Sequence, residues 1–258
     1  MLVLLRNVNP HEALPEAARH ALRRAGESPI SYAVRVVRAP DGRRVAILGE
    51  AHVKLAKAAA IGRDVVSQFE LRGVETFQQR QVFLGRALGV LIMAPRALLR
   101  LLTFGFVKGS TITDAKQLPS GYTVELERAK RMPFGLHVAS AYLTGFFSVA
   151  LLTLGLPLLD VIAPRLADVV RTASLAFNVH FLAIVPAALL RRHSWSWVIH
   201  PFVGILGPRD ELMAAGTVRM LEDHRGIGAA VVVMGRAHVP GYERLLVERH
   251  GFARIEAW

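Results

Sequence analysis

The sequence predicts an α/β protein in which two βαβ-type repeats share one central sheet, with a hydrophobic helical hairpin inserted between them. Two similar segments support the repeats: VAILGEAHV at Val45–Val53 and VVVMGRAHV at Val231–Val239. Each is an apolar run that ends in Gly, any residue, Ala, His and Val. A helical pattern and a second strand pattern follow each of them, which indicates parallel strands joined by a right-handed crossover. Two long uncharged runs in the middle of the chain predict the hairpin.

The first repeat follows a predicted N-terminal helix within residues 1–31. The segments YAVRVVRA and RVAILGE are predicted to form a β-hairpin, because the Asp41-Gly42 pair between them is a strong turn signal. The segment VKLAKAAAIGRD after His52 is predicted to be helical. The next strand is predicted at VVSQFEL, so that Glu70 lies inside it.

The second repeat has the same order of elements. AAVVVMG is predicted to be a buried strand, and FARIEAW a closing strand. PGYERLLVERHG between them is predicted to be a helix, since it has a proline in its first turn and a glycine at its end. Glu256 follows His238 at the spacing at which Glu70 follows His52. Because Glu256 is so close to the C-terminus, we expect it to have a structural role.

The middle of the chain contains two runs without Asp, Glu, Lys or Arg, Met132–Leu159 and Thr172–Leu190. Both exceed the roughly 18 apolar residues that indicate a transmembrane helix. Nine basic and three acidic residues lie between Arg80 and Arg131. Basic residues before the first run and after the second predict that both ends of the hairpin are cytoplasmic. The alternative is a soluble protein in which these runs form two buried core helices.

A further apolar segment, Phe83–Val107, is interrupted by Arg86, Arg96 and Arg100. Three arginines argue against a membrane span. They favour either a helix on the membrane surface or one packed on the domain. An even number of spans also keeps both repeats on one side of the membrane. The predicted organisation is therefore the first half of an α/β domain at 1–131, the hydrophobic insert at 132–200, and the second half at 201–258.

Composition narrows the class of protein. The chain has 258 residues and a formal net charge of +12, and it contains no cysteine, which excludes disulfides, thiolate metal ligands and a cysteine nucleophile. Aromatic and basic residues do not interleave in an RNA-binding pattern, so nucleic acid is not an expected partner. The apolar start of MLVLLRNVNP is too short for a signal peptide. We expect a membrane protein whose α/β domain is cytoplasmic and whose partners are membrane lipid and a peptide or small-molecule substrate.

The duplicated motif places a histidine just past the end of each of two predicted strands. Open α/β sheets bind ligands at the carboxyl ends of their parallel strands. Two such histidines, His52 and His238, could converge on one ion, and the carboxylate of Glu70 would complete a site open to water. A single Gly-x-x-His is more often structural, and the duplication strengthens the functional interpretation. Gly-x-Ser-x-Gly, P-loop and His-Glu-x-x-His motifs are absent from the sequence.

These residues resemble the TraB/PrgY/GumN family, which belongs to a wider group with the TIKI proteases and, more remotely, with erythromycin-esterase-like and ChaN-like proteins. The resemblance covers about residues 43–131 and 201–257, and the hydrophobic insert departs from it. Pro208 stands where a glutamate is common in the family. The matching motifs are GEAH, GRAH, QFELRG with Glu70, GPRDELMAAG with Arg209 and Asp210, and GSTITDAKQLPSGYTVELERAKR with Glu127 and Arg128.

The resemblance implies a hydrolase that acts on peptides and depends on a divalent metal ion, of which Mn, Co and Zn are the candidates. His52 and His238 would bind the metal or activate water, and Glu70 would be a ligand or general base. Glu50 is a second candidate base. Arg209 would stabilise a developing oxyanion or a substrate carboxylate.

Alternatives remain for several of these residues. Glu50 could face solvent at the end of its strand, and Arg209 and Asp210 could only start and cap a helix. Glu127 and Arg128 are interpreted as a solvated pair. His180 in the second apolar run is expected to make an interhelical hydrogen bond. The alternative functions are a non-catalytic regulator that binds a peptide or other ligand in the same cleft, and a transporter accessory built around the hairpin.

Overall fold

The computed structural model describes residues 14–51, 54–103, 107–108, 110–189 and 198–255. The protein is an α/β protein with one six-stranded mixed sheet and two long apolar helices in the middle of the chain. The chain forms two compact units. The first unit consists of Met1–Thr76, Leu99–Arg128 and Asp210–Trp258, and the second of Phe77–Leu98 and Ala129–Arg209.

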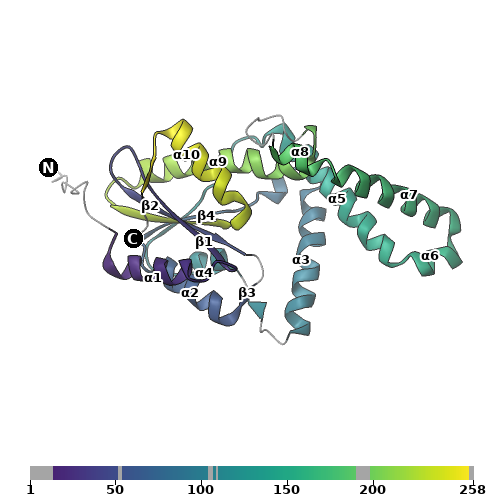
Figure 1. Ribbon diagram of the computed structural model, residues 1–258, viewed down its shortest axis with the longest axis horizontal. Helices are drawn as coiled ribbons and strands as arrows, with labels where there is room; N and C mark the ends of the chain where they lie inside the picture. The colour runs from purple at the N-terminus through teal and green to yellow at the C-terminus, as the bar shows by residue number, and fades with distance from the viewer. Residues whose placement is uncertain (1–13, 52–53, 104–106, 109, 190–197, 256–258) are drawn as a thin grey trace. The chain divides into compact units, whose positions relative to one another are not determined.

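The six-stranded sheet of the first unit has the strand order β6-β4-β7-β2-β1-β8. Three of its strands, β1, β2 and β4, are labelled in Figure 1. Strands β6, β4, β7 and β2 are mutually parallel, whereas β1 is antiparallel to both β2 and β8. Two short strands pair separately as β3 and β5. The strands are β1 (Tyr32–Arg38), β2 (Arg44–Glu50), β3 (Lys54–Leu55), β4 (Leu71–Val74), β5 (Val107–Lys108), β6 (Tyr122–Glu125), β7 (Ala229–Gly235) and β8 (Ala253–Ile255).

Helices cover both faces of this sheet (Figure 1). Alternate residues of β7 point to opposite faces, so Val232 packs with α9 and α10 while Val233 packs with α1, α2 and α4. A strand buried on both faces explains the uninterrupted apolar run AAVVVMG. The helices are α1 (Glu16–Gly26), α2 (Ala56–Ser67), α4 (Thr111–Gln117), α9 (Pro201–Asp223) and α10 (Val239–His250), with a 3₁₀ turn η3 at Arg236–His238. Of α9, residues 210–223 belong to this unit.

Several sequence predictions for this unit are confirmed. The β1–β2 hairpin forms around Gly42, whose positive φ of 91° is available to glycine without strain. The strand AAVVVMG and the helix α10 lie where they were predicted, and the helix ends at Gly251 with a φ of 70°. The predicted helix after His52 is α2.

The predicted strand VVSQFEL is wrong. Val65 and Val66 belong to the last turns of α2, where they are fully buried against the sheet, and the strand β4 begins only at Leu71. A short apolar run fits a helix face and a strand equally well, so periodicity could not decide between them. The consequence is that Glu70 precedes β4 instead of lying inside it.

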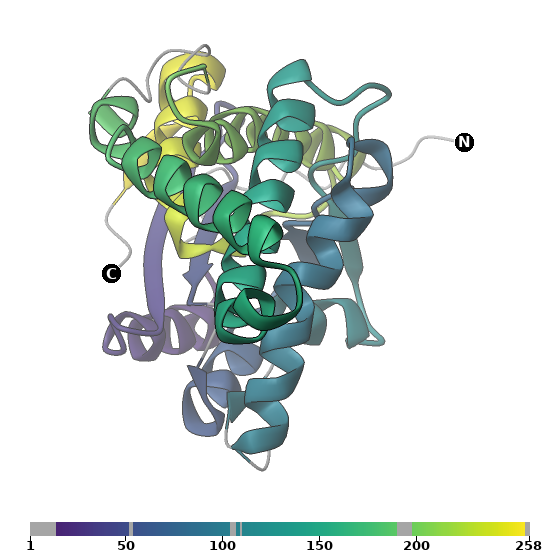
Figure 2. The same ribbon diagram turned by 90° about the vertical axis from the view of Figure 1, so that its right-hand side faces the viewer.

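The second unit contains the helical hairpin, in which α5 and α7 lie side by side and α6 packs on α7 (Figures 1 and 2). Two segments are long and apolar enough to cross a membrane: Phe134–Leu154 with a mean hydropathy of 1.5 and Pro164–Pro186 with 1.4. Core helices of soluble proteins can have the same length and hydropathy. The elements of this unit are η1 (Gln79–Gln81), α3 (Gly85–Leu102), α5 (Phe134–Leu154), α6 (Leu156–Ile162), α7 (Pro164–Phe181) and α8 (Ile184–Leu189). Of α3, residues 85–98 belong to this unit.

Helix α7 differs from the predicted second span at Thr172–Leu190. It begins at Pro164, and its first two turns carry Asp168 and Arg171. Arg171 pairs with Asp168 and with Asp160 of α6, so these charges are partnered where the hairpin turns. Only 6% of the Pro164–Pro186 window is buried. Helix α7 is thus mostly exposed, whereas 33% of the α5 window is buried. The choice between a membrane hairpin and two core helices stays a prediction.

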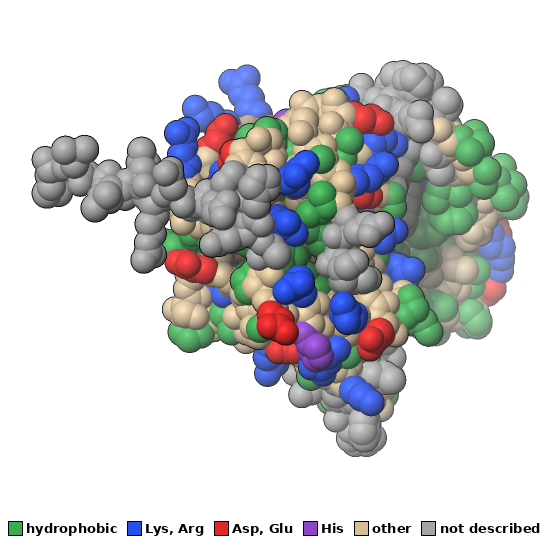
Figure 3. Space-filling view, turned by 60° about the vertical axis from the view of Figure 1, so that its left-hand side comes forward, with side chains coloured by type: hydrophobic (Ala, Val, Ile, Leu, Met, Phe, Trp, Pro, Cys, Tyr) green, Lys and Arg blue, Asp and Glu red, His purple; other side chains and the backbone are tan. Residues whose placement is uncertain are grey.

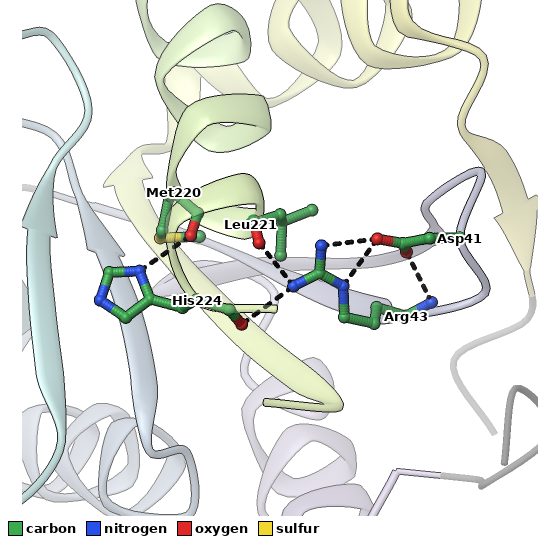
Figure 4. A network of polar contacts seen from close by, with 5 residues as sticks. All are labelled: Asp41, Arg43, Met220, Leu221 and His224. Carbon is green, nitrogen blue, oxygen red and sulfur yellow. Dashed lines mark hydrogen bonds and ion pairs between the residues drawn. The ribbon is translucent and has the colours of Figure 1, made fainter. Parts of the chain in front are cut away.

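The end of α9 is tied to the β1–β2 turn by Arg43 (Figure 4). The guanidinium Nη1 donates to the carbonyl oxygens of Leu221 at 2.7 Å and His224 at 3.1 Å, each of which also accepts a longer backbone hydrogen bond. Asp41 accepts from Nε of Arg43 at 2.8 Å. Burial would raise the pKa of Asp41, but the hydrogen bonds and charge of Arg43 outweigh it and lower that pKa below 3.8.

Replacing Arg43 by Ala is expected to lower the free energy of unfolding by about 2 kcal/mol, because two carbonyls lose a charged donor. The pKa of Asp41 is depressed in the folded state, so the ionised carboxylate stabilises the fold above about pH 4. This stabilisation is lost as the pH falls through the pKa of Asp41 in the folded protein. Denaturant unfolding of the protein in detergent, followed by circular dichroism, measures the free energy of unfolding of the variant and its dependence on pH. Arg38→Ala, at an exposed position of β1, is the control. An equal effect of both substitutions would contradict this role of Arg43.

The surface of the first unit carries charges of both signs. In Figure 3, the Lys and Arg side chains on the visible face are interspersed with Asp and Glu. Several exposed arginines are paired, for example Arg24 with Asp64 and Arg249 with Glu211.

Candidate functional site

The buried imidazole of His238 is the centre of the candidate site. It lies in η3, three residues beyond the end of β7, and only 3% of its surface is exposed. Its Nδ1 is 2.6 Å from Oδ1 of Asp210, and its Nε2 is 3.6 Å from Oε1 of Glu75. A carboxylate can only accept the short hydrogen bond, so Nδ1 carries the proton. The other ring nitrogen, Nε2, faces the carboxylate of Glu75.

Asp210 reaches His238 from the interior of helix α9 and is 1% exposed. The alternative that Arg209 and Asp210 only start and cap a helix is wrong, because α9 begins at Pro201 and runs through Pro208. A proline inside a helix removes one backbone hydrogen bond but does not always end the helix. In this position Asp210 orients the imidazole instead of capping the helix.

Glu75, and not Glu70, is the carboxylate next to His238. It directly follows β4, its backbone N–H donates to the carbonyl of Val233 at 2.9 Å, and its Oε2 accepts a hydrogen bond from the N–H of Gly235. Glu70 is exposed and precedes β4. Since β4 and β7 are parallel, Glu70 lies at the amino edge of the sheet and His238 at the carboxyl edge.

Glu50 ends β2 beside Gly235 of β7 and is fully buried. The alternative that it faces solvent is therefore wrong. Its Oε1 accepts from the Ser110 hydroxyl, and its Oε2 accepts from the N–H of Thr111 at 2.7 Å, so it holds the start of α4. Burial, together with the nearby Glu50 charge, raises the pKa of Tyr32 to about 12, although the hydrogen bond with Thr111 opposes the shift.

The glycines of the two Gly-x-x-His motifs, Gly49 and Gly235, lie at the ends of the neighbouring strands β2 and β7. Gly49 pairs with Met234 in the parallel register. A Cβ atom at Gly49 would stand 2.2 Å from Cγ2 of Val239 and 3.2 Å from Cα of Arg236. The glycine of the first motif is thus required by the close approach of the second motif. His52, the histidine of the first motif, lies outside the described residues.

Arg209 belongs to the second unit. It is 8% exposed, and its guanidinium lies 5.0 Å from the centre of the Phe77 ring, within the range of a cation–π interaction. Its expected role as an oxyanion-stabilising group stays a prediction. The interhelical hydrogen bond expected of His180 is confirmed, because Nδ1 of His180 on α7 is 2.7 Å from the hydroxyl of Tyr142 on α5.

Sequence reasoning missed two features of the carboxyl edge. Glu75 directly follows the end of β4, as Glu50 ends β2, but the misplaced strand concealed that position. Glu127, interpreted as part of a solvated pair, is 1% exposed and follows β6, whereas its neighbour Arg128 is exposed. The useful signal would have been an acidic residue at or just after the end of each parallel strand.

The donor set fits a divalent metal ion in part. Two ligands on one tetrahedral ion stand about 3.4 Å apart, and Nε2 of His238 and Oε1 of Glu75 are 3.6 Å apart. A histidine that gives Nδ1–H to a carboxylate and leaves Nε2 for the ion is a common arrangement in metal sites. No group of three or more His, Asp or Glu side chains placed to hold a metal ion occurs among the residues that the structure describes.

Comparisons of the chain with protein-family models, with curated proteins and with solved structures found no match. The resemblance to the TraB/PrgY/GumN family stays a prediction from the motifs.

Proposed function

We propose that this chain is a membrane-associated, TraB-like hydrolase that cleaves peptides or related small molecules with the help of a divalent metal ion. The observation that carries the proposal is the buried imidazole of His238 between two carboxylates, Asp210 at 2.6 Å and Glu75 at 3.6 Å. A neutral Nε2 and a carboxylate oxygen repel each other through their lone pairs. A cation or a proton between them removes that repulsion.

In this proposal each residue has a separate role. Asp210 holds the Nδ1–H tautomer of His238, which presents the Nε2 lone pair. Glu75 is held by the N–H of Gly235 and presents its other oxygen toward Nε2. His238 and Glu75 would hold the metal ion, with His52 as the expected third ligand. A bound divalent ion would supply an activated water molecule and polarise the bond to be cleaved.

The duplicated motif is explained if each half of the chain contributes one histidine to a common site. Support comes from the two strand–helix–strand successions β2–α2–β4 and β7–α10–β8, whose strands are all parallel members of one sheet. The first strands of the two successions, β2 and β7, are direct neighbours. We infer two βαβ repeats that share a sheet and meet at its carboxyl edge.

The hairpin α5–α7 would anchor the protein in the membrane. Helix α5 has 21 residues, and at about 1.5 Å per residue it matches the hydrocarbon thickness of a bilayer. The nine basic residues between Arg80 and Arg131 favour a cytoplasmic α/β domain.

Metal content tests the proposal. The protein is purified in detergent, incubated with Mn, Co or Zn, freed of excess metal and analysed by elemental mass spectrometry. We expect near-stoichiometric metal in the wild type and its loss in the His52→Ala/His238→Ala variant. His20→Ala, at an exposed position of α1, is the matched control. Wild-type protein without metal after all three incubations would contradict a metal-dependent hydrolase.

Cleavage of a complex peptide mixture, followed by mass spectrometry, is the second measurement. We expect new peptide termini with the wild type and the His20→Ala protein and none with the double variant. Metal without any cleavage would instead favour the regulator that binds a ligand at the same residues.

A further inference from the structure

Helix α3, which is not part of the hairpin α5–α7, also has an exposed apolar face. Val90, Met93 and Leu101 are 68%, 57% and 73% exposed. Together with the exposed Ala97 they are spaced three or four residues apart, so they follow one side of the helix. An exposed apolar stripe of this length indicates an interaction surface.

The two residues just before α3 are also apolar and exposed, at a conformational cost. Leu84 has a φ of 55°, a left-handed conformation that is disfavoured for leucine, and it is the only such non-glycine residue in the described part of the chain. Phe83 and Leu84 are nevertheless 63% and 45% exposed. The backbone of Phe83 is held in place, because its N–H donates to Nδ1 of His137 at 3.1 Å.

The basic residues around α3 favour an anionic partner for this face. From Arg80 to Thr113 the sequence contains five basic residues and no Asp or Glu. Arg86 is exposed and lies four residues before Val90, on the same side of α3, and Arg96 and Arg100 belong to the same helix. A helix that combines an exposed apolar stripe with arginines fits the interface of an anionic bilayer, where apolar side chains enter the acyl boundary and arginines meet the headgroups. A nucleic acid would leave the apolar stripe in water.

Continuity with the hairpin supports the same partner. His137, which accepts the hydrogen bond from the N–H of Phe83, belongs to α5, the first helix long and apolar enough to cross a membrane. The start of α3 is therefore fixed to the helix that would enter the bilayer. We propose that Phe83, Leu84 and the exposed side of α3 form a second membrane contact, which docks on the headgroup region of anionic lipids.

The absence of cysteine from the chain makes a clean test possible. Met93→Cys, Leu175→Cys and Ser67→Cys are each labelled with a nitroxide and reconstituted into vesicles of phosphatidylcholine, with or without phosphatidylglycerol. Leu175 reports on the hairpin, since it is 65% exposed on α7, and Ser67 is an exposed control at the end of α2. Paramagnetic collision with oxygen, which concentrates in lipid, and with a water-soluble nickel chelate measures the depth of each label.

We expect the label at 93 to be oxygen-accessible and shielded from nickel in anionic vesicles, at a depth shallower than the label at 175. Arg86→Gln/Arg96→Gln/Arg100→Gln in the Met93→Cys background should lower the ratio of docked to undocked protein by about fivefold per arginine. The same three changes should leave the label at 175 unaffected. High salt should also release the label at 93, because it screens the attraction.

A label at 93 that behaves like the one at 67, while 175 lies in lipid, would overturn the proposal and leave the hairpin anchor intact. A label at 93 shielded from both reagents would overturn it in favour of packing against protein. If neither 93 nor 175 meets lipid, both membrane contacts fail. The metal assay in detergent is independent of all three outcomes, so it tests the hydrolase separately.

Discussion

Replacing Asp210 by Asn is expected to weaken metal binding and hydrolysis roughly 10- to 100-fold while the fold is retained, as for partners that orient a metal-binding histidine. Asn has the shape of Asp but no charge, and its amide can donate as well as accept. It therefore no longer selects the tautomer of His238 that presents Nε2. The short contact of 2.6 Å between Nδ1 and Oδ1 is the physical basis of the expectation.

The metal dissociation constant, measured by competition with a chromogenic chelator, separates this positioning role from a general loss of stability. Glu211→Gln is a matched control on the same helix, because Glu211 is the next residue and pairs instead with Arg249 at 3.1 Å. The expected result is a wild-type dissociation constant for Glu211→Gln. Equal constants for the two variants would show that Asp210 does not position His238.

The second large effect is expected at Gly216, a buried glycine in α9. A Cβ atom there would stand 2.1 Å from the carbonyl oxygen of Leu126 and 2.8 Å from its C and Cα atoms. These are backbone atoms just after β6, and they cannot rotate away as a flexible side chain would. We expect Gly216→Ala to lower the free energy of unfolding by about 3 kcal/mol, since a methyl group forced into a packed contact displaces the chain.

Gly226→Ala is the control for that measurement, because an added Cβ atom at Gly226 meets nothing within 4 Å. Its free energy of unfolding should stay within about 0.5 kcal/mol of the wild type. Denaturant unfolding in detergent, followed by circular dichroism, compares the three proteins. If Gly216→Ala were as stable as Gly226→Ala, the close packing of α9 on the segment after β6 would be wrong.

The elements predicted best from sequence were those whose signals are local. The Asp41-Gly42 turn sets the β1–β2 hairpin, and Gly251 ends α10 with a positive φ. The apolar run of β7 has the length of a strand and contains three β-branched valines, which indicates a buried strand. Each of these features depends on a few neighbouring residues, so it could be predicted without knowledge of the tertiary structure.

The errors arose where packing decided between two local possibilities. Val65 and Val66 suit a strand or a helix, and their burial against the sheet in α2 made them helical. Pro208 suits the start of a helix, yet α9 extends back to Pro201. These two errors hid Glu75 and the orienting role of Asp210, because both depend on where an element ends or begins.

The sequence by itself determined the α/β class, the β1–β2 hairpin, the duplicated Gly-x-x-His motifs and the two long apolar helices. Periodicity, turn residues and the absence of charge encode these features along the chain. Only the tertiary structure decided which carboxylates surround His238. Asp210 and Glu75 are far from His238 in sequence, and they meet it only because β4 and β7 pair in parallel and α9 packs across the sheet. That pairing depends on strand order and register, which no local pattern specifies.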